Sequence, residues 1–292
     1  MKSATRVLLF KSPRFETRIC QLKKNAAMPQ HHDALRAAYG FGLFPVPSYR
    51  PASQGNWRIA NHMPSLGNGY LSPTVVEARA VLTRGREVWM SIGLLEKESH
   101  AWHVHCAHGV VVTAGVGMGM YVYAAAMKPN VDLVIAADIS PDIISLMRQS
   151  TGFENWPCRD KVRLIALDAL GPDFASKVAE CTGGRPVDYL YADIWPRFPA
   201  PEAPEQTAAM ASALRPKAAG WWGQELSFAQ YCRRSEHPVD EDSLHAYFGD
   251  IGIPAPPITP GYAAFCRDAM SANGMGAKRP FWRRLGNLFH GQ

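Results

Sequence analysis

The feature that most constrains the fold is a β-branched run that ends in three closely spaced glycines, Val110-Val-Val-Thr-Ala-Gly115-Val-Gly117-Met-Gly119. A short apolar run bounded by turn residues is typical of a strand buried on both faces, as in a parallel sheet. Glycines directly after such a strand let the backbone turn sharply and approach a ligand without interference from Cβ atoms. The next segment, 121–127, favours a helix, whose N-terminal N–H groups would point toward the same ligand. The stretch therefore predicts the first strand and nucleotide-binding loop of a Rossmann-like domain.

The spacing of the glycines narrows the choice of ligand. A dinucleotide-binding loop has the spacing Gly-x-Gly-x-x-Gly. In this chain the third glycine comes one position early, at Gly119, and Met120 stands where the dinucleotide loop has its glycine. NAD is therefore disfavoured.

Three further apolar runs follow the loop, and each ends on an aspartate. The runs are 131–137, 162–167 and 187–192, and the aspartates are Asp138, Asp168 and Asp193. A helix over 141–148, with Ser140 as its N-cap, is expected between the first two. Open α/β sheets bind ligands at the carboxyl ends of their strands, so the three carboxylates are expected at the binding edge. Asp138, 19 residues after Gly119, is placed to accept both hydroxyls of a ribose.

The glycine loop and the acidic strand ends resemble the motifs of class I S-adenosylmethionine-dependent methyltransferases, over residues 94–232. The resemblance implies an α/β fold with a doubly wound, mostly parallel sheet, and S-adenosylmethionine as the cofactor. It also implies a set of cofactor-binding residues along the sheet edge. These are Gly115, Gly117 and Gly119 at the amino-acid end, Asp138 with Ile139 at the ribose, and Asp168 with Ala169 at the adenine.

Within that family the chain most resembles the spermidine synthase (polyamine aminopropyltransferase) branch. Both have a non-acidic residue, here Thr113, two positions before the first glycine, where most class I methyltransferases have an acid. In that branch the fourth strand ends on an acid that takes a proton from the attacking amine, and Asp193 matches it by position. We predict Asp193 as the catalytic group and Trp195 as an apolar wall beside it, with His103 and Glu225 as weaker candidates for the base. The second acid of the branch is missing from Asp193-Ile-Trp-Pro196.

Three functions are compatible with these residues. The first is an S-adenosylmethionine-dependent methyltransferase that acts on a small-molecule acceptor. The second is a polyamine aminopropyltransferase-like enzyme, against which the missing second acid counts. The third is a methyltransferase-like binding module without catalysis, which Thr113 and the altered run after Asp193 keep open.

The composition restricts the class of protein, its location and its partners. With 47% hydrophobic and 19% charged residues the chain predicts a globular protein, and no apolar run reaches the roughly 18 residues of a membrane span. Because no signal peptide is evident, a cytoplasmic location is expected. Basic residues gather in 1–24 and from residue 277 onward, an arrangement that gives no strong nucleic-acid signal. The basic, aromatic tail 281–289 is a candidate contact for a membrane surface or a protein partner.

Neither metal nor disulfide chemistry is predicted. Four histidines and a cysteine fall between His100 and His108, but the two i, i+3 histidine pairs lie on different helix faces with no acid between them. We expect packing roles for some of these histidines and a place at the cofactor cleft for one or two. The six cysteines include no Cys-x-x-Cys pair, so they are expected to be reduced.

The predicted organisation is an N-terminal accessory α+β region over 1–93, the Rossmann-like domain over 94–236, and a C-terminal extension over 237–292. In the accessory region we expect several elements. They are a helix at 34–38, a hairpin turn at 67–69 between strands 56–60 and 70–72, a helix at 73–82 and a strand at 87–91. A helix at 94–108 leads into the glycine loop. Later, 205–214 is expected to be helical and 219–226 to be strand five, and no further strands are evident after 243.

Overall fold

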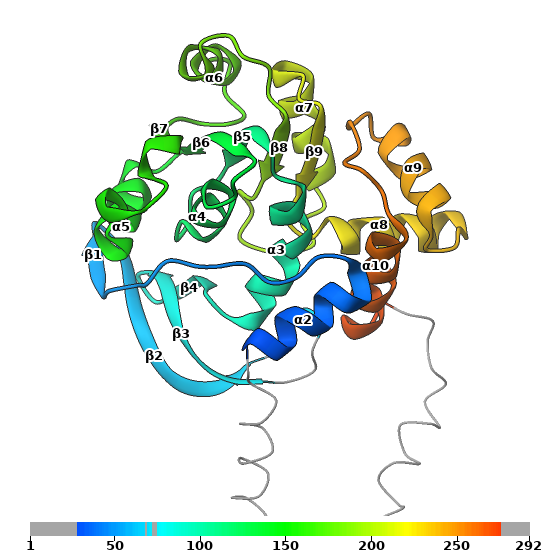
Figure 1. The fold of residues 1–292 in the computed structure, drawn as a ribbon, viewed down its shortest axis with the longest axis horizontal. Helices are drawn as coiled ribbons and strands as arrows, with labels where there is room; N and C mark the ends of the chain where they lie inside the picture. The colour runs from blue at the N-terminus through cyan, green and yellow to red at the C-terminus, as the bar shows by residue number, and fades with distance from the viewer. Residues whose placement is uncertain (1–27, 68, 72–74, 276–292) are drawn as a thin grey trace, which may run out of the picture.

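The computed structural model describes residues 28–67, 69–71 and 75–275, and it contains two sheets (Figure 1). One is antiparallel and has the order β1-β2-β3-β4. Its strands are β1 (Ala52–Gln54), β2 (Trp57–Gly67), β3 (Val75–Arg84) and β4 (Glu87–Ser91). The other is parallel and has the order β7-β6-β5-β8-β9. Its strands are β5 (Gly109–Ala114), β6 (Val131–Asp138), β7 (Val162–Ala166), β8 (Tyr189–Ala192) and β9 (Ala218–Trp221).

The parallel sheet is doubly wound around the strand that precedes the glycine loop. From β5 the chain passes to β6 and β7 on one side, then returns to β8 and β9 on the other. The helices along this part of the chain are α3 (Leu94–Cys106), α4 (Met120–Ala126), α5 (Pro141–Thr151), α6 (Phe174–Thr182) and α7 (Ala203–Leu214). Helix α4 packs on α3, and α6 packs on α7. The strand order confirms the predicted Rossmann-like fold and puts its switch point between β5 and β8.

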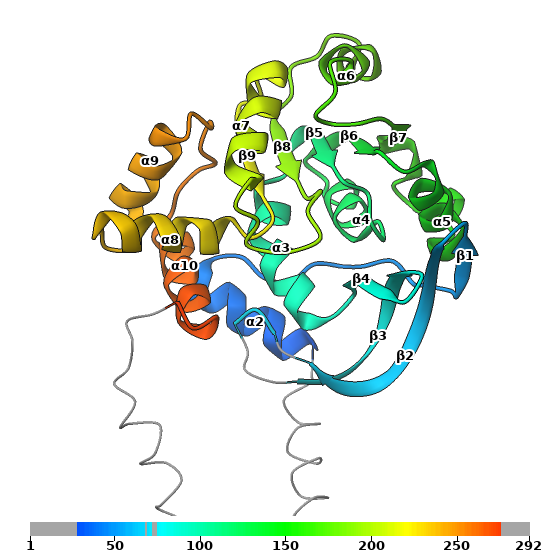
Figure 2. The ribbon, with the colours of Figure 1, turned by 180° about the vertical axis from the view of Figure 1, so that it is seen from behind.

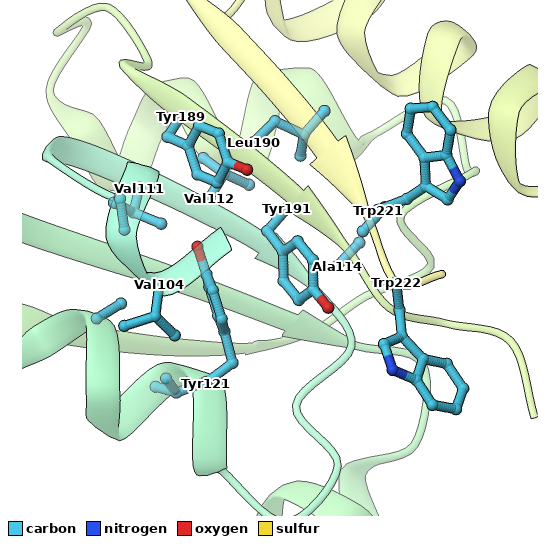
Figure 3. Packing of buried hydrophobic residues seen from close by; sticks show 14 of the residues in the cluster. Val104, Val111, Val112, Ala114, Tyr121, Tyr189, Leu190, Tyr191, Trp221 and Trp222 are labelled. Carbon is cyan, nitrogen blue, oxygen red and sulfur yellow. The ribbon is translucent and has the colours of Figure 1, made fainter. Parts of the chain in front are cut away.

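The core of this domain forms where β5 and β8 meet the helices beside them (Figure 3). Tyr189 and Tyr191 leave β8 on the same side because side chains two apart on a strand share a face. The Tyr191 ring lies 4.3 Å from the ring of Tyr121 on α4, measured between centroids. All three tyrosines are buried. The β-branched run of β5, with Val111 and Val112 fully buried, fills the centre of the sheet as its composition predicted.

The predicted helix at 73–82 is wrong, because the described part of this segment is strand β3. It pairs with β2 on one side and with β4 on the other. Val81, Leu82 and Thr83 suit a pleated surface, and pairing on both edges satisfies the backbone in a way that the local sequence does not reveal. Glu77 projects from this strand to accept a hydrogen bond from the backbone N–H of Leu94 at 2.9 Å, which satisfies a free donor in the first turn of α3.

Two neighbouring predictions also need correction. The hairpin is formed by β2 and β3, with Gly67 opposite Val75, so Tyr70 and Leu71 are not part of a partner strand. Asn68 and 72–74 lie outside the described residues. The strand predicted over 219–226 ends at Trp221, and α8 (Gln224–Ser235) begins three residues later. Gly223 has a φ of 81° at this junction, a left-handed conformation that ends the strand and directs the chain into the helix.

Most of the other predicted elements are present with small changes of boundary. The helix expected at 34–38 is the centre of α2 (Met28–Tyr39), and the strand expected at 87–91 is β4. Ser140 is the N-cap of α5, and its side chain accepts a hydrogen bond from the N–H of Ile143 at 3.4 Å. The helix expected at 94–108 is α3, which ends at Cys106.

Beyond β9 the described chain is helical. Helices α8, α9 (Glu241–Asp250) and α10 (Pro260–Ala272) lie beside β9, at the opposite end of the parallel sheet from β7 (Figures 1 and 2). Helix α10 packs on both α8 and α2, so the two ends of the described chain meet. The division at residues 93 and 236 stays a prediction, and the tail 281–289 lies outside the described residues. None of the helices described is both long and apolar enough to cross a membrane.

Candidate functional site

A cavity of about 520 Å³ lies at the carboxyl ends of the parallel strands. One half is lined by residues that follow β6 and β7, including Asp138, Ile139 and Asp168. The other half, which we call the β8–β9 half, is lined by residues that follow those two strands, including Asp193 and Trp222. The glycine loop after β5 lies between the two halves because β5 is the central strand. The volume is within the range of small-molecule sites, roughly 300–1,000 Å³.

The glycine loop requires glycine at its first position for two independent reasons. Gly115 has a φ of 97°, and a Cβ atom there would lie 2.0 Å from the backbone oxygen of Asp193. Gly119, with a φ of 77°, is the N-cap residue of α4, and a Cβ there would press on the side chain of Met147. Gly115 and Gly117 both line the cavity. The loop backbone therefore borders the cavity at Gly115 and Gly117, and its predicted role in binding a cofactor stays a prediction.

Asp138 lies where the sequence placed it, at the end of β6 and in the cavity wall. Its carboxylate accepts hydrogen bonds from the N–H of Val116 at 3.0 Å and from the N–H of Ser140 at 2.9 Å. Burial raises the pKa of this carboxyl above its ordinary value, although the backbone N–H groups act in the opposite direction. Each carboxylate oxygen can accept a second hydrogen bond. Asp138 therefore holds the glycine loop and still presents acceptors to a ligand.

Apolar side chains flank the strand ends next to Asp138. Ile139 is 72% exposed and Leu170 is 44% exposed, and both line the cavity. Between them Asp168 accepts a hydrogen bond from the N–H of Leu170 at 2.9 Å, and Ala169 is buried in the wall. This half of the cavity therefore combines exposed aliphatic side chains with the carboxylates of Asp138 and Asp168.

In the β8–β9 half, Asp193 forms a cluster with two residues of α3. Its Oδ2 lies 3.2 Å from Nε2 of His100, and Nδ1 of His100 lies 2.7 Å from the backbone oxygen of Glu96. The Glu96 Oε2 is 3.9 Å from the same Nδ1. His100 is fully buried, whereas Glu96 and Asp193 both line the cavity. We call these three residues the Glu96–His100–Asp193 cluster.

The hydrogen bonds of His100 indicate its protonation state. A carbonyl oxygen can only accept, so Nδ1 carries a hydrogen. When Asp193 is ionised, Nε2 must also donate, and the ring is then an imidazolium. Burial opposes that charge, but the hydrogen bond that His100 donates to Asp193 and the negative charge of Asp193 raise the pKa of His100 above its ordinary value. Burial also raises the pKa of Glu96 to about 7.

Tryptophans cover the rest of this half. Trp195 is buried in the wall and donates a hydrogen bond from Nε1 to Gln206 Oε1 at 2.8 Å, which ties the loop after β8 to α7. Trp222 donates from Nε1 to Ser99 Oγ at 3.0 Å and packs near the His100 ring. Trp195 and Trp222 therefore both line this half of the cavity, and the role predicted for Trp195 stays a prediction.

The two weaker base candidates lie in the core. His103 is fully buried and its Nδ1 bonds the hydroxyl of Tyr189 at 2.9 Å. Glu225 is also fully buried and accepts hydrogen bonds from Tyr70 at 3.0 Å and Tyr262 at 3.1 Å. Neither belongs to the described lining of the cavity. Of the histidines in α3, the one that reaches the cleft cluster is therefore His100 rather than His103.

The accessory sheet contributes a wall that sequence reasoning missed. Four of its residues line the cavity, namely Trp57, Arg84, Trp89 and Met90. The Arg84 guanidinium lies over the Trp57 ring, with its Cζ 5.3 Å from the ring centroid, and the rings of Trp57 and Trp89 meet edge to face. These residues match no motif, so only the fold brings them to the site.

Glu96 was also missed, although a sequence signal for it exists. Glu96 and His100 are four residues apart on one helix, the spacing that places two side chains on the same face. Among the described residues no group of three or more histidine, cysteine, aspartate or glutamate side chains is arranged to hold a metal ion.

Comparisons with known proteins found distant structural likenesses. No protein-family model and no curated protein sequence matches the chain. The chain is similar to the methyltransferase domain of bacterial CtHen1-CN, with 12% identity, a TM-score of 0.30, and coverage of 40% of this chain and 57% of that one. It is also similar to a spermidine synthase in complex with the transition-state analogue AdoDATO, with 13% identity, a TM-score of 0.33, and coverage of 62% and 57%.

The chain thus spans 57% of the length of each of these two structures. The strand order defines a Rossmann-like, doubly wound α/β fold, with a cavity at the carboxyl edge of its parallel sheet.

Proposed function

We propose that the protein is an S-adenosylmethionine-dependent methyltransferase that acts on a small-molecule acceptor. The observation that carries the proposal is the continuity of one cavity across the switch point. It joins a half suited to a nucleoside, at Asp138 and Asp168, to a half with an acid–base cluster and an indole wall. An enzyme of this kind needs a cofactor site and an acceptor site that open into one cavity, and the two halves meet at the glycine loop.

The residues present fit the proposed cofactor. Gly115 and Gly117 would bring backbone to its amino-acid end, Asp138 with Ile139 would hold the ribose, and Asp168 with Ala169 would hold the adenine. Ile139 and Leu170, which are exposed and line the cavity, would give the ring apolar contacts. S-Adenosylmethionine, when bound, supplies a methyl carbon attached to a good neutral leaving group. The protein's main task is then to hold an acceptor in line with that carbon, and Asp193 would orient the acceptor or take its proton.

The experiment that tests the proposal is calorimetric titration of the full chain with three ligands. They are S-adenosylmethionine, S-adenosylhomocysteine and decarboxylated S-adenosylmethionine. Micromolar or tighter binding of the first two is expected. A clear preference for the decarboxylated ligand would replace the proposal with an aminopropyl transfer, and no binding of any of the three would overturn it.

Turnover distinguishes an enzyme from a binding module with the same fold. Incubation with methyl-labelled S-adenosylmethionine and a mixture of small amines, alcohols, thiols and carboxylates is expected to transfer label to at least one class. Tight binding of S-adenosylhomocysteine with no transfer to any class would favour a binding module.

A further inference from the structure

Tryptophan is concentrated around the cavity. Four of the eight tryptophans of the chain line it, and they form two walls. Trp57 and Trp89 belong to the accessory sheet, whereas Trp195 and Trp222 follow β8 and β9. The four rings come from two separate sheets, so packing within a single layer does not account for their convergence on one space.

In the β8–β9 half, both indoles are held by hydrogen bonds to other parts of the protein. Trp195 donates from Nε1 to Gln206, and Trp222 donates from Nε1 to Ser99. The indole N–H is the one hydrogen-bonding group of a tryptophan side chain. With both N–H groups engaged, these two residues offer a ligand only the apolar surfaces of their rings, in fixed orientations.

The wall formed by the accessory sheet is also held in place before a ligand arrives. The Arg84 guanidinium lies over one face of the Trp57 ring. The Trp89 ring meets Trp57 at an interplanar angle of 88°, with 5.2 Å between the centroids. Trp89 itself is only half-buried, so part of its ring is open to contact.

A β-bulge turns Trp89 toward the cavity. Val88 pairs with Thr83 and Met90 pairs with Leu82, so Trp89 is the extra residue between these two pairs. Consecutive side chains of a regular strand point to opposite faces, but Trp89 and Met90 both line the cavity. Bulges of this kind redirect side chains and are frequent beside active sites. The irregularity in β4 therefore adds to the cavity a ring that a regular strand would direct away from it.

We propose that the acceptor carries a planar aromatic ring, which packs against the tryptophans of this cavity. The proposal rests on the proposed function and names the acceptor class for it. Indole rings favour another flat π-system through offset-stacked and edge-to-face contacts, which add to the burial of apolar area. Met90 adds a thioether, which makes favourable contacts with aromatic rings. A saturated chain or ring of the same size gains only the burial of apolar area.

The proposal is tested with 2-phenylethanol and its saturated counterpart 2-cyclohexylethanol, titrated into the full chain with and without S-adenosylhomocysteine. Both are neutral alcohols with the same carbon skeleton, and two methylene groups separate the hydroxyl from the ring. Burial of apolar area alone predicts that the saturated alcohol binds at least as tightly. We expect 2-phenylethanol to bind at least about threefold more tightly, measured by ligand-observed NMR.

Each other outcome of this titration has a defined meaning. Equal or tighter binding of 2-cyclohexylethanol, or no binding of either alcohol, would overturn the proposal. Loss of 2-phenylethanol binding when S-adenosylhomocysteine is added would also overturn it, because the ring would then occupy the cofactor space. If S-adenosylhomocysteine does not bind and the preference for the aromatic alcohol is intact, the proposed function fails and the aromatic subsite stands.

Variants assign the preference to particular rings. Trp89→Leu and Trp222→Leu keep an apolar side chain and remove the π-system, so each is expected to reduce the preference to less than about twofold. Trp89→Phe and Trp222→Phe keep an aromatic ring and should retain it. A preference that survives in both leucine variants would contradict the assignment. The comparison of the two alcohols on the wild type does not depend on how well any variant folds.

Trp221 provides a matched control. It is the neighbour of Trp222 but points the other way, where its ring packs against Tyr247 and Phe248 of α9 (Figure 3). Trp221→Phe is expected to leave the preference for 2-phenylethanol unchanged. Loss of the preference in this variant as well would show that it does not arise from the rings that line the cavity.

Discussion

At the scale of single residues, the site depends on carboxylates that each serve two partners. Asp138 holds the N–H groups of Val116 and Ser140 and also faces the cavity. Asp193 bonds His100 and faces the same cavity further along the sheet. Under the proposed function Asp138 would arrange the cofactor loop and Asp193 would orient the acceptor, so their variants should affect different measurements.

We predict that Asp138→Ala weakens the binding of S-adenosylhomocysteine by at least about tenfold, since it removes charged acceptors of hydrogen bonds and releases the N–H of Val116. Calorimetric titration measures this directly. Asp132→Ala, at the exposed opposite end of the same strand, is the control and should bind as the wild type does. Unchanged affinity in Asp138→Ala would show that the cofactor lies elsewhere.

Asp193→Asn is expected to leave the affinity for S-adenosylhomocysteine within about threefold and to lower kcat by about 10² to 10⁴, the range typical of a lost general base. Steady-state kinetics on the acceptor class identified by labelling gives the comparison. A normal kcat, or a loss of cofactor affinity as large as that of Asp138→Ala, would contradict the division of roles.

At this scale the sequence predicted the residues that belong to a motif and missed those that do not. Asp138, Asp168 and Asp193 each follow a recognisable buried strand, so their place at the sheet edge follows from the fold class. Glu96 and His100 lie on the helix before the motif, and the contact between His100 and Asp193 joins positions 93 residues apart. Such a contact depends on how α3 packs on the sheet, which no local pattern determines.

At the scale of elements, two factors restrict the first position of the glycine loop to glycine: its backbone conformation and its contact with the backbone of Asp193. We predict that Gly115→Ala lowers the free energy of unfolding by more than about 2 kcal/mol and abolishes binding of S-adenosylhomocysteine, because the new Cβ would meet the backbone of Asp193. Urea denaturation and calorimetry provide the two readouts.

The matched control for that change is Gly183→Ala. Gly183 also has a positive φ, 63°, but a Cβ there meets no atom within 4 Å. We expect Gly183→Ala to lower the free energy of unfolding by about 1 kcal/mol and to leave the binding of S-adenosylhomocysteine unchanged. Similar costs for the two variants would mean that conformation alone, and not the contact with Asp193, limits the loop.

Helix α3 has an unusual C-terminal cap that also lends itself to a test. The Nζ of Lys128 donates hydrogen bonds to the backbone oxygens of Val104, His105 and Ala107 at 2.7, 2.6 and 2.6 Å. Lys128→Met should reduce the free energy of unfolding by about 1–3 kcal/mol, because it leaves carbonyl groups without a charged donor. Chemical denaturation gives the value, and the exposed Lys177→Met is the control, with an expected change below about 0.5 kcal/mol. Equal changes would exclude a capping role.

Sequence reasoning located best the elements whose pattern of apolar residues reflects their burial. The strands of the parallel sheet are continuous apolar runs, and α5 carries both its N-cap serine and proline at its start. Strand β3 was predicted as a helix because proline at 73 and the charged Glu77 and Arg79 fit a helix start as well as an antiparallel strand. Its partners β2 and β4 decide between the two, and they are tertiary information.

At the scale of the whole molecule, a buried polar centre joins distant parts of the chain. Glu225 on α8 accepts hydrogen bonds from Tyr70 beside the accessory sheet and from Tyr262 on α10, and its Oε1 lies 3.8 Å from His103 Nε2. Burial raises the pKa of Glu225 to about 7, although the tyrosine hydrogen bonds lower it. Burial lowers the pKa of His103.

The raised pKa of Glu225 makes the stability of the fold depend on pH in a defined direction. Between its ordinary value of 4.5 and about 7, the folded chain holds a proton that the unfolded chain has lost, so the contribution of this group to stability falls as pH rises. Glutamine does not titrate, so Glu225→Gln lacks this loss. We predict that, from pH 4.5 to pH 8, the free energy of unfolding of Glu225→Gln rises relative to that of wild type by on the order of 3 kcal/mol. Urea denaturation at both pH values tests this. The control Glu180→Gln should show the same change in the free energy of unfolding between the two pH values as wild type. If Glu225→Gln also shows the same change as wild type, the raised pKa of Glu225 is contradicted.

The contacts of the accessory sheet with the rest of the molecule have a thermodynamic consequence. Glu77 satisfies the first turn of α3, Met90 lies against the glycine loop at Gly117, and Gln54 bonds Asp142 at the start of α5. Trp57 and Trp89 of the same sheet border the ligand cavity. A ligand that fills the cavity touches both layers, so its binding energy also opposes their separation. By linkage, ligand binding makes the antiparallel hairpins harder to open. Opening of the sheet lowers the affinity for the ligand by the same factor as the ligand lowers the opening equilibrium.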